Sequence, residues 1–242
     1  MKLTDHLISL RTTPSYEEAT RHPFLLEAGE GSLPSARLAL WLSQDRIYAA
    51  HAYPRFIGSL ISLIPFHQRD SITGPEEAAN QKILKILVGC LDNIVREVGF
   101  FKDTAERWDL DMEGWKERKG TRDYTAEMAR VSNASLKEGL IFLWAMERVY
   151  LDAWKFVNNL QKATQSGTSE SPVLAFSQNW SSTEFEVFVA ELADLVDELG
   201  IVPNTKDWYA AEAVWSRVVE LEVGFWPEKG EESDMRLDNK KL

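Results

Sequence analysis

A chain of 242 residues with 44% hydrophobic side chains is long enough to bury one sizeable core, and no shift in its composition divides it into two domains. Its 27 basic and 38 acidic side chains give a net charge of -11, which excludes the usual attraction to nucleic acids and anionic membranes, so we predict neither as a partner. The single cysteine excludes an intramolecular disulfide, and the N-terminus lacks the apolar stretch of a signal peptide, so we predict a cytoplasmic protein.

The spacing of apolar residues predicts an all-α protein, because they recur at intervals of three and four and no alternating strand-like run lies between turn signals. The longest near-apolar run, 56–66, is well short of the ~20 residues that cross a bilayer. In chain order we predict helices over residues 16–30, 35–64, 76–101 with a short further piece at 102–108, 123–133, 135–160, 182–200 and 206–226.

The composition of three segments between or after these helices predicts irregular structure. Residues 116–121 are mostly charged and predict a loop, and residues 163–171 are rich in Thr, Ser and Gly and predict a surface loop. Beyond Pro227 the composition turns to charge, Gly and Ser. We therefore predict one helical domain over residues 1–227 and a disordered tail over residues 228–242.

Three carboxylates interrupt the apolar faces of three different predicted helices. Asp45, Glu147 and Glu222 each fall in a row of apolar residues at helical spacing, with tyrosines and tryptophans beside them. An acid that faces a helical core must be neutralised, paired or used. The structural alternative is a buried salt bridge in each case, for which the candidate partners are Arg46, Arg55, Arg148 and Arg217.

Other chemistry is disfavoured by the sequence. The four histidines all lie in the first third of the chain and none has a glutamate three residues before it, so we predict no metal site. Cys90 shares a helical face with Ile83, Leu87 and Ile94, which predicts a buried, unreactive thiol.

Several segments resemble motifs of the TenA/thiaminase II family over residues 16–226. Gln44-Asp45 followed by Tyr48 is the most specific of them, and Glu222 with Phe225-Trp226 resembles the closing motif of the family. The other matching segments are His22-Pro23-Phe24, Gly31-Ser32-Leu33-Pro34, Tyr124-Thr125-Ala126-Glu127-Met128 and Asn179-Trp180-Ser181-Ser182-Thr183-Glu184-Phe185.

The resemblance implies a heme-oxygenase-like helical bundle that forms a homo-oligomer, a dimer or a tetramer, and binds a small aminopyrimidine without a cofactor. In this family the acid at the position of Asp45 pairs with the amino group and ring nitrogen of the pyrimidine. The glutamate at the position of Glu222 is the general acid/base. The remaining ring-contacting positions correspond to Tyr48, Tyr124, Tyr150, Phe225 and Trp180, the last of which replaces a tyrosine of the family.

The nucleophilic cysteine of thiaminase II has no counterpart here. Met146 or Glu147 occupies its position, depending on a one-residue gap, and we favour Glu147 because the chain resembles the branch of the family that lacks the cysteine. That branch implies hydrolysis of aminomethyl- and formylaminomethyl-pyrimidines to hydroxymethylpyrimidine. Glu147 and Glu222 would then supply a pair of carboxylates for acid/base catalysis. The alternative is a protein that binds a pyrimidine or another planar ligand with little or no turnover.

Overall fold

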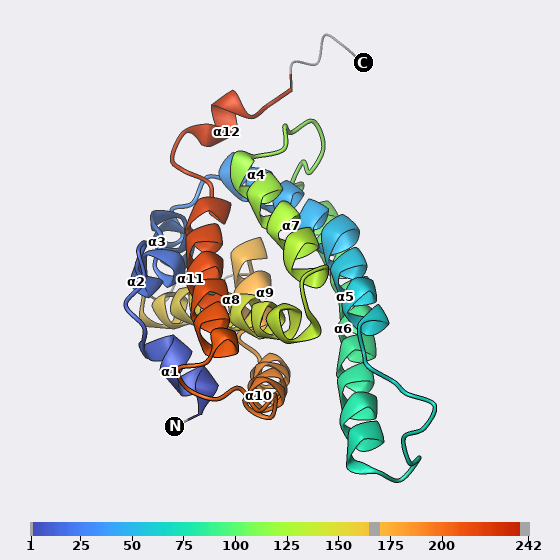
Figure 1. Cartoon of the computed structure of the whole chain (residues 1–242). Coiled ribbons are helices and arrows are strands. Elements are labelled where there is room, and N and C mark those ends of the chain that lie inside the picture. The colour runs from blue at the N-terminus through green and yellow to red at the C-terminus, as the bar shows by residue number, and fades with distance from the viewer. Residues whose placement is uncertain (1, 165–169, 238–242) are drawn as a thin grey trace.

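The computed structural model describes residues 2–164 and 170–237 (Figure 1). Within these ranges no strand is present, only an isolated bridge between Trp115 and Arg236, so the prediction of an all-α protein is confirmed. The helices are α1 (Leu3–Ser9), α2 (Tyr16–Thr20), α3 (Pro23–Glu30), α4 (Ser35–Ile47), the π-helical η1 (Tyr48–Ala52), α5 (Tyr53–Ser62), α6 (Pro75–Arg107), α7 (Lys119–Ser132), α8 (Leu136–Thr164), α9 (Pro172–Trp180), α10 (Thr183–Asp197), α11 (Lys206–Phe225) and α12 (Glu231–Asp234).

Helix α8 forms the centre of the bundle. Its residues 140–146 are all buried, and a helix that is apolar on every side requires neighbours all round. It packs against α2, α3, α7, α9, α10 and α11, and it crosses behind α11 in the view of Figure 1. None of the helices in the described ranges combines the length and apolarity that a bilayer crossing requires.

The predicted helix over residues 35–64 follows one course, but a π turn interrupts it. The backbone N–H of Tyr53 donates to the carbonyl of Tyr48, which lies five residues earlier. In an α-helix the acceptor would be the carbonyl four residues earlier. The change of register falls directly before Pro54, which has no N–H to donate. The predicted helix over residues 76–101 and the piece at 102–108 form one helix, α6.

Other boundaries differ from the predictions for local reasons. The predicted helix over residues 16–30 is two helices, because Pro23 cannot continue α2 and instead begins α3, where His22 Nδ1 accepts the N–H of Phe24 at 3.2 Å. Helix α7 begins at Lys119, inside the predicted loop 116–121. The short helices α1 and α9 were not predicted. Of the predicted loop 163–171, residues 165–169 lie outside the described residues.

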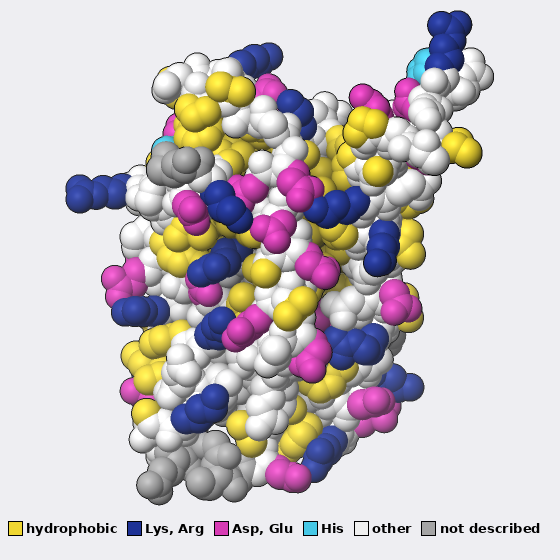
Figure 2. Space-filling view, turned by 90° about the horizontal axis from the view of Figure 1, so that it is seen from below, with side chains coloured by type: hydrophobic (Ala, Val, Ile, Leu, Met, Phe, Trp, Pro, Cys, Tyr) yellow, Lys and Arg dark blue, Asp and Glu magenta, His cyan; other side chains and the backbone are white. Residues whose placement is uncertain are grey.

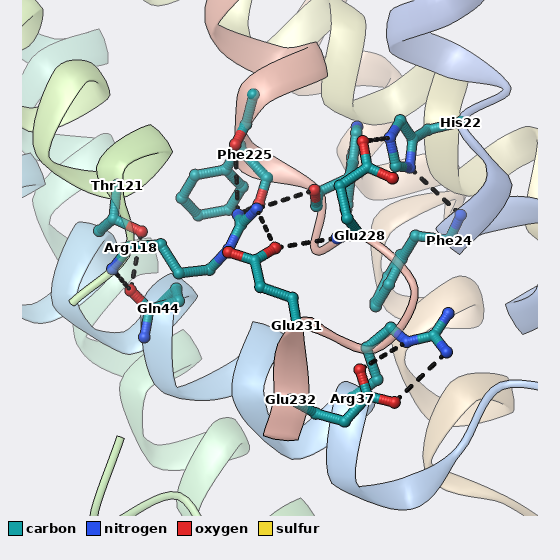
Figure 3. Close-up of polar contacts among 12 residues, drawn as sticks. His22, Phe24, Arg37, Gln44, Arg118, Thr121, Phe225, Glu228, Glu231 and Glu232 are labelled. Atoms are coloured by element: carbon teal, nitrogen blue, oxygen red, sulfur yellow. Dashed lines mark hydrogen bonds and ion pairs between the residues drawn. The ribbon is translucent and has the colours of Figure 1, made fainter. Parts of the chain in front are cut away.

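The prediction of a disordered tail is wrong for residues 228–237. Two buried guanidinium groups hold this segment against the bundle through helix α12 (Figure 3). Arg118 donates to both carboxylate oxygens of Glu231 at 2.8 and 2.7 Å, and Arg37 donates to Glu232 at 3.0 Å. A buried arginine requires acceptors, and the acidic tail provides them. We call Arg37, Arg118, Glu231 and Glu232 the C-terminal clamp; residues 238–242 lie outside the described residues.

Charged side chains on the surface are mixed in sign. Figure 2 shows acidic and basic groups interspersed over the face seen from below Figure 1, with apolar side chains between them. The net charge of -11 is therefore not gathered into one acidic patch on that face.

Candidate active site

A small cavity lies inside the bundle. It is lined by residues of α4, η1 and α5 on one side and of α6, α7, α8, α9 and α11 on the others. Its volume is about 40 Å³, room for only a few water molecules. All eight residues that the sequence singled out as site residues line it: Asp45, Tyr48, Tyr124, Glu147, Tyr150, Trp180, Glu222 and Phe225. The three acids therefore converge on one space, as the motif positions imply.

Each of the three acids accepts a hydrogen bond from a tyrosine hydroxyl on another helix. The pairs are Asp45 with Tyr150 at 3.1 Å, Glu147 with Tyr53 at 2.8 Å, and Glu222 with Tyr124 at 2.6 Å. The second oxygen of Glu222, Oε2, is buried and has no hydrogen-bond partner among the described residues. A buried acceptor without a donor is costly to the fold, so this oxygen is a natural contact for a ligand.

The salt-bridge alternative does not hold. Arg148 pairs with Asp152, and Arg217 pairs with Glu127 and Glu220. Among the described residues no ion pair to Asp45, Glu147 or Glu222 is found, and none of the four candidate arginines lines the cavity.

Burial without a positive partner shifts the acids toward their neutral forms. It raises the pKa of Glu147 to about 8, with a further contribution from the charge of Glu97. It likewise raises the pKa of Glu222 to about 8, although the hydrogen bond from Tyr124 acts in the opposite direction. Burial, and after it the charge of Glu97, raises the pKa of Asp45 well above its usual range. Burial therefore favours the protonated form of each of the three acids, and Glu147 and Glu222 exchange protons near neutral pH.

The π turn decides which side chains of its helix reach the cavity. In an uninterrupted α-helix, the residues that follow Asp45 on its face are Tyr48, Ala49, Ala52 and Tyr53, and of these Ala52 points most nearly in the direction of Asp45. The wider turn of η1 adds a residue, and Tyr53 lines the cavity in place of Ala52. Its hydroxyl donates to Glu147, so the departure from α-helical geometry supplies one of the acids with its partner.

A fourth acid, Glu97 on α6, was missed by the sequence reasoning. Its Oε1 accepts the indole N–H of Trp180 at 3.0 Å, and burial raises its pKa. Trp180 replaces a tyrosine of the family motifs, and its N–H binds a carboxylate that those motifs do not include. The signal was present, because Glu97 falls between Ile94 and Phe101 on the buried stripe of α6, as the other three acids do on theirs.

The open choice between Met146 and Glu147 is not resolved by position alone. Both side chains line the cavity, at consecutive places on α8. Tyr48 O–H donates to the sulfur of Met146 at 3.0 Å. A thioether carries no acidic proton, whereas Glu147 can take up or release one, so only Glu147 can act in proton transfer.

Two polar side chains hold the helices that carry the acids. Gln44, directly before Asp45, accepts the backbone N–H of Arg118 at 2.8 Å and the hydroxyl of Thr121 at 2.9 Å (Figure 3). Arg118 in turn donates to the carbonyls of Gly224, Phe225 and Trp226, which end the helix of Glu222. The start of α7 thus joins α4 to the end of α11, and the acids on those helices are fixed relative to each other.

No group of three or more His, Cys, Asp and Glu side chains suited to a metal ion is found in the described part of the chain. The polar groups of the cavity are carboxyl, hydroxyl, indole and amide groups.

These features define the class of protein: a single all-α bundle with the heme-oxygenase-like fold, enclosing a cavity of acids and aromatic rings. The chain belongs to the TENA/THI-4/PQQC family, whose sequence model matches residues 11–232.

Solved structures agree on the fold. A TenA homologue from Pyrococcus furiosus superimposes with a TM-score of 0.74 at 22% sequence identity, covering 93% of this chain and 98% of the homologue. A second TenA homologue, from P. horikoshii, gives a TM-score of 0.75 at 16% identity, covering 93% of this chain and 97% of the other.

Two curated relatives are similar along most of the chain. One is the "Probable bifunctional TENA-E protein" of Glycine max, 22% identical over 87% of this chain and 86% of the relative. The other is a "Probable transcription factor" of Fusarium pseudograminearum, 23% identical over 93% of this chain. The chain spans only 50% of the length of that second relative.

Proposed function

We propose that the protein hydrolyses thiamine-related pyrimidines at the exocyclic methylene carbon. Membership of the family supports a thiamine-related role in general. The proposed reaction takes an aminomethyl- or formylaminomethyl-pyrimidine and one water. The bond between the methylene carbon and nitrogen breaks, the water oxygen bonds to that carbon, and hydroxymethylpyrimidine leaves with ammonia or formamide.

One observation carries the proposal: Glu222, whose Oε2 has no hydrogen-bond partner among the described residues, and Glu147 line the same cavity, and each has a pKa of about 8. Such a pair is suited to acid/base work near neutral pH, because one member can hold a proton while the other accepts one. Glu222 donates a proton to the departing nitrogen, and Glu147 takes a proton from the attacking water.

Asp45 is suited to the amidine edge of a 4-aminopyrimidine. That edge presents an N–H donor beside a ring-nitrogen acceptor, and a neutral carboxyl group presents the complementary acceptor and donor. Burial, which raises the pKa of Asp45, favours this neutral form before the ligand binds. Tyr48, Phe225 and Tyr124 form edge-to-face contacts with centroid distances of 5.3 to 5.9 Å and supply an aromatic wall for the ring.

The alternative is a protein that binds a pyrimidine without useful turnover; the Fusarium relative is named as a probable transcription factor and not as an enzyme. Incubation with aminomethylpyrimidine, its formyl derivative and thiamine, followed by chromatography, separates the two. We expect hydroxymethylpyrimidine from the first two compounds and little cleavage of thiamine, because no cysteine lines the cavity. Tight binding of hydroxymethylpyrimidine without turnover of any compound would favour the alternative.

A further inference from the structure

A second hollow, which we call the outer groove, opens beside the cavity. It lies between α6 and the segment of α9 and α10, and its volume is about 480 Å³. The cavity, at about 40 Å³, is less than a tenth as large. A ligand that extends through both would therefore have its larger part in the groove.

Two side chains of α6 separate the cavity from the groove. Asn93 and Glu97, one helical turn apart, line both hollows. Asn93 Nδ2 lies 3.5 Å from Glu97 Oε1, and Arg96 donates to Asn93 Oδ1 at 2.7 Å. Asn93 is only half-buried. A substituent that leaves the cavity at this point passes a carboxyl group and an amide, both of which can bond to an N–H or a carbonyl.

The groove combines an apolar floor with charged walls of both signs. Phe185 and Phe188, with ring centroids 6.0 Å apart, provide apolar surface. The α10 wall carries Glu184 and Glu191, and the α6 wall carries Lys85. A purely anionic or purely apolar ligand would leave one of these walls unmatched. An aminoacyl group matches all three features, with an apolar side chain, a protonated amine and a carbonyl.

We propose that the outer groove binds the acyl part of N-acylated aminomethylpyrimidines, with an aminoacyl group that carries an apolar side chain as the preferred class. This inference rests on the proposed function, which places the ring and its methylene carbon in the cavity, and it requires the walls of that cavity to move apart, because about 40 Å³ is too small for the ring. The reaction is the same hydrolysis. Water adds its oxygen to the methylene carbon, the carbon–nitrogen bond breaks, a proton goes to nitrogen, and an amino acid amide leaves through the groove.

Glycine at position 89 allows the groove to be filled without touching the cavity. Gly89 lines the groove but not the cavity, and a Cβ built on it meets no atom within 4 Å. Gly99 is a matched control on the same helix, also exposed and also with open space at its Cβ, but it lines neither hollow. Replacing either glycine inside a helix by phenylalanine does not lower helix propensity.

The test compares three compounds, aminomethylpyrimidine and its N-formyl and N-leucyl derivatives, in the wild type, Gly89→Phe and Gly99→Phe. In the wild type we expect kcat/KM for the leucyl compound to be about tenfold above that for the formyl compound. In Gly89→Phe, kcat/KM should fall at least tenfold for the leucyl compound and stay within twofold of the wild-type value for aminomethylpyrimidine. Gly99→Phe should resemble the wild type with all three.

The outcomes separate this inference from the proposed function. Turnover of the small compounds with poor use of the leucyl compound by the wild type would overturn the inference alone. The inference would also be overturned if Gly89→Phe lowered kcat/KM equally for all three compounds, or for none of them. If the wild type turns over none of the three, the proposed function fails, and the inference fails with it.

Discussion

The cavity and the C-terminal clamp both bury charged groups, but they neutralise them in opposite ways. In the clamp, Arg37 and Arg118 are almost fully buried and each is bound by carboxylates. In the cavity, the acids accept hydrogen bonds from uncharged hydroxyl, indole and amide groups. Burial raises the pKa of Glu231, but the hydrogen bonds from Arg118 and from the backbone N–H of Glu228, together with the charge of Arg118, outweigh it, and the pKa is lowered. In Glu222 nothing outweighs burial, and the pKa rises to about 8.

The difference distinguishes a structural use of buried charge from a functional one. A matched pair of charges holds two segments together and has no capacity left for a ligand. An unmatched acid destabilises the fold but keeps a proton and an unfilled acceptor for chemistry. Mutations should therefore damage stability in the clamp and turnover in the cavity.

Glu222→Gln should have the largest effect, on turnover. The amide keeps the volume and can still accept from Tyr124, but it cannot transfer a proton. We expect kcat to fall about 10³-fold, as loss of a general acid does, while binding of hydroxymethylpyrimidine by calorimetry changes less than threefold. Because a buried acid is removed, the melting temperature should stay the same or rise. Wild-type turnover in this variant would contradict the assigned role.

Arg118→Met should show the opposite pattern. It removes the donors of three carbonyls at the end of α11 and leaves Glu231 without its partner. We expect a loss of about 3 kcal/mol in the free energy of unfolding, measured by urea titration. Arg236→Met is the control: its ion pair with Asp111 is on the surface, so its loss should cost about 1 kcal/mol or less. Equal losses in the free energy of unfolding in the two variants would show that the buried ion pair of the clamp stabilises the fold no more than a surface pair does.

Asp45→Asn should weaken binding more than it slows the chemical step. An amide presents its own donor and acceptor, but it cannot share a proton with the ring nitrogen of the pyrimidine. We expect the Kd for hydroxymethylpyrimidine to rise about 10- to 100-fold, with kcat at saturation lowered less than tenfold. A large fall in kcat with an unchanged Kd would place Asp45 in proton transfer instead.

Local pattern was sufficient for the fold class and for most of the cavity. The acids at 45, 147 and 222 could be found because each breaks an apolar stripe, and the motifs joined helices that are far apart in sequence. Glu97 broke a stripe in the same way but belonged to none of the quoted motifs. The tyrosine partner of each acid could not be predicted, because it lies on another helix. Tyr53, for example, reaches Glu147 by way of the π turn before Pro54.

The tail shows why composition can mislead. Residues 228–237 have the charge and small residues of a disordered segment. Their order comes from two arginines that lie more than 100 residues earlier, Arg37 and Arg118. A contact at that sequence distance leaves no local pattern, so the clamp could be recognised only in three dimensions.

The pH dependence of stability should differ between the two regions. Glu222 has a pKa of about 8 in the folded protein and an ordinary value of 4.5, so between these values the folded state holds a proton that the unfolded chain has released. Its contribution to stability therefore falls as pH rises, by up to about 1.4 kcal/mol per pH unit. Glu231, whose pKa is lowered, loses its contribution as pH falls through the acid range. The urea midpoint should decline less steeply between pH 5 and pH 8 in Glu222→Gln than in the wild type. Parallel plots of the midpoint against pH for the two proteins would show that the pKa of Glu222 is not raised.

Cys90→Ala should have the smallest effect, and it tests whether a thiol takes part at all. Cys90 is 1% exposed, does not line the cavity, and burial raises the pKa of its thiol to about 12, so almost no thiolate forms at neutral pH. Yet it lies close enough to Tyr53 for hydrogen bonding to affect its pKa, which places it just behind the partner of Glu147. We expect turnover of aminomethylpyrimidine to stay within twofold. Loss of turnover, with a melting temperature within a few degrees of the wild type, would mean that the thiol reaches the cavity and replaces the missing nucleophile.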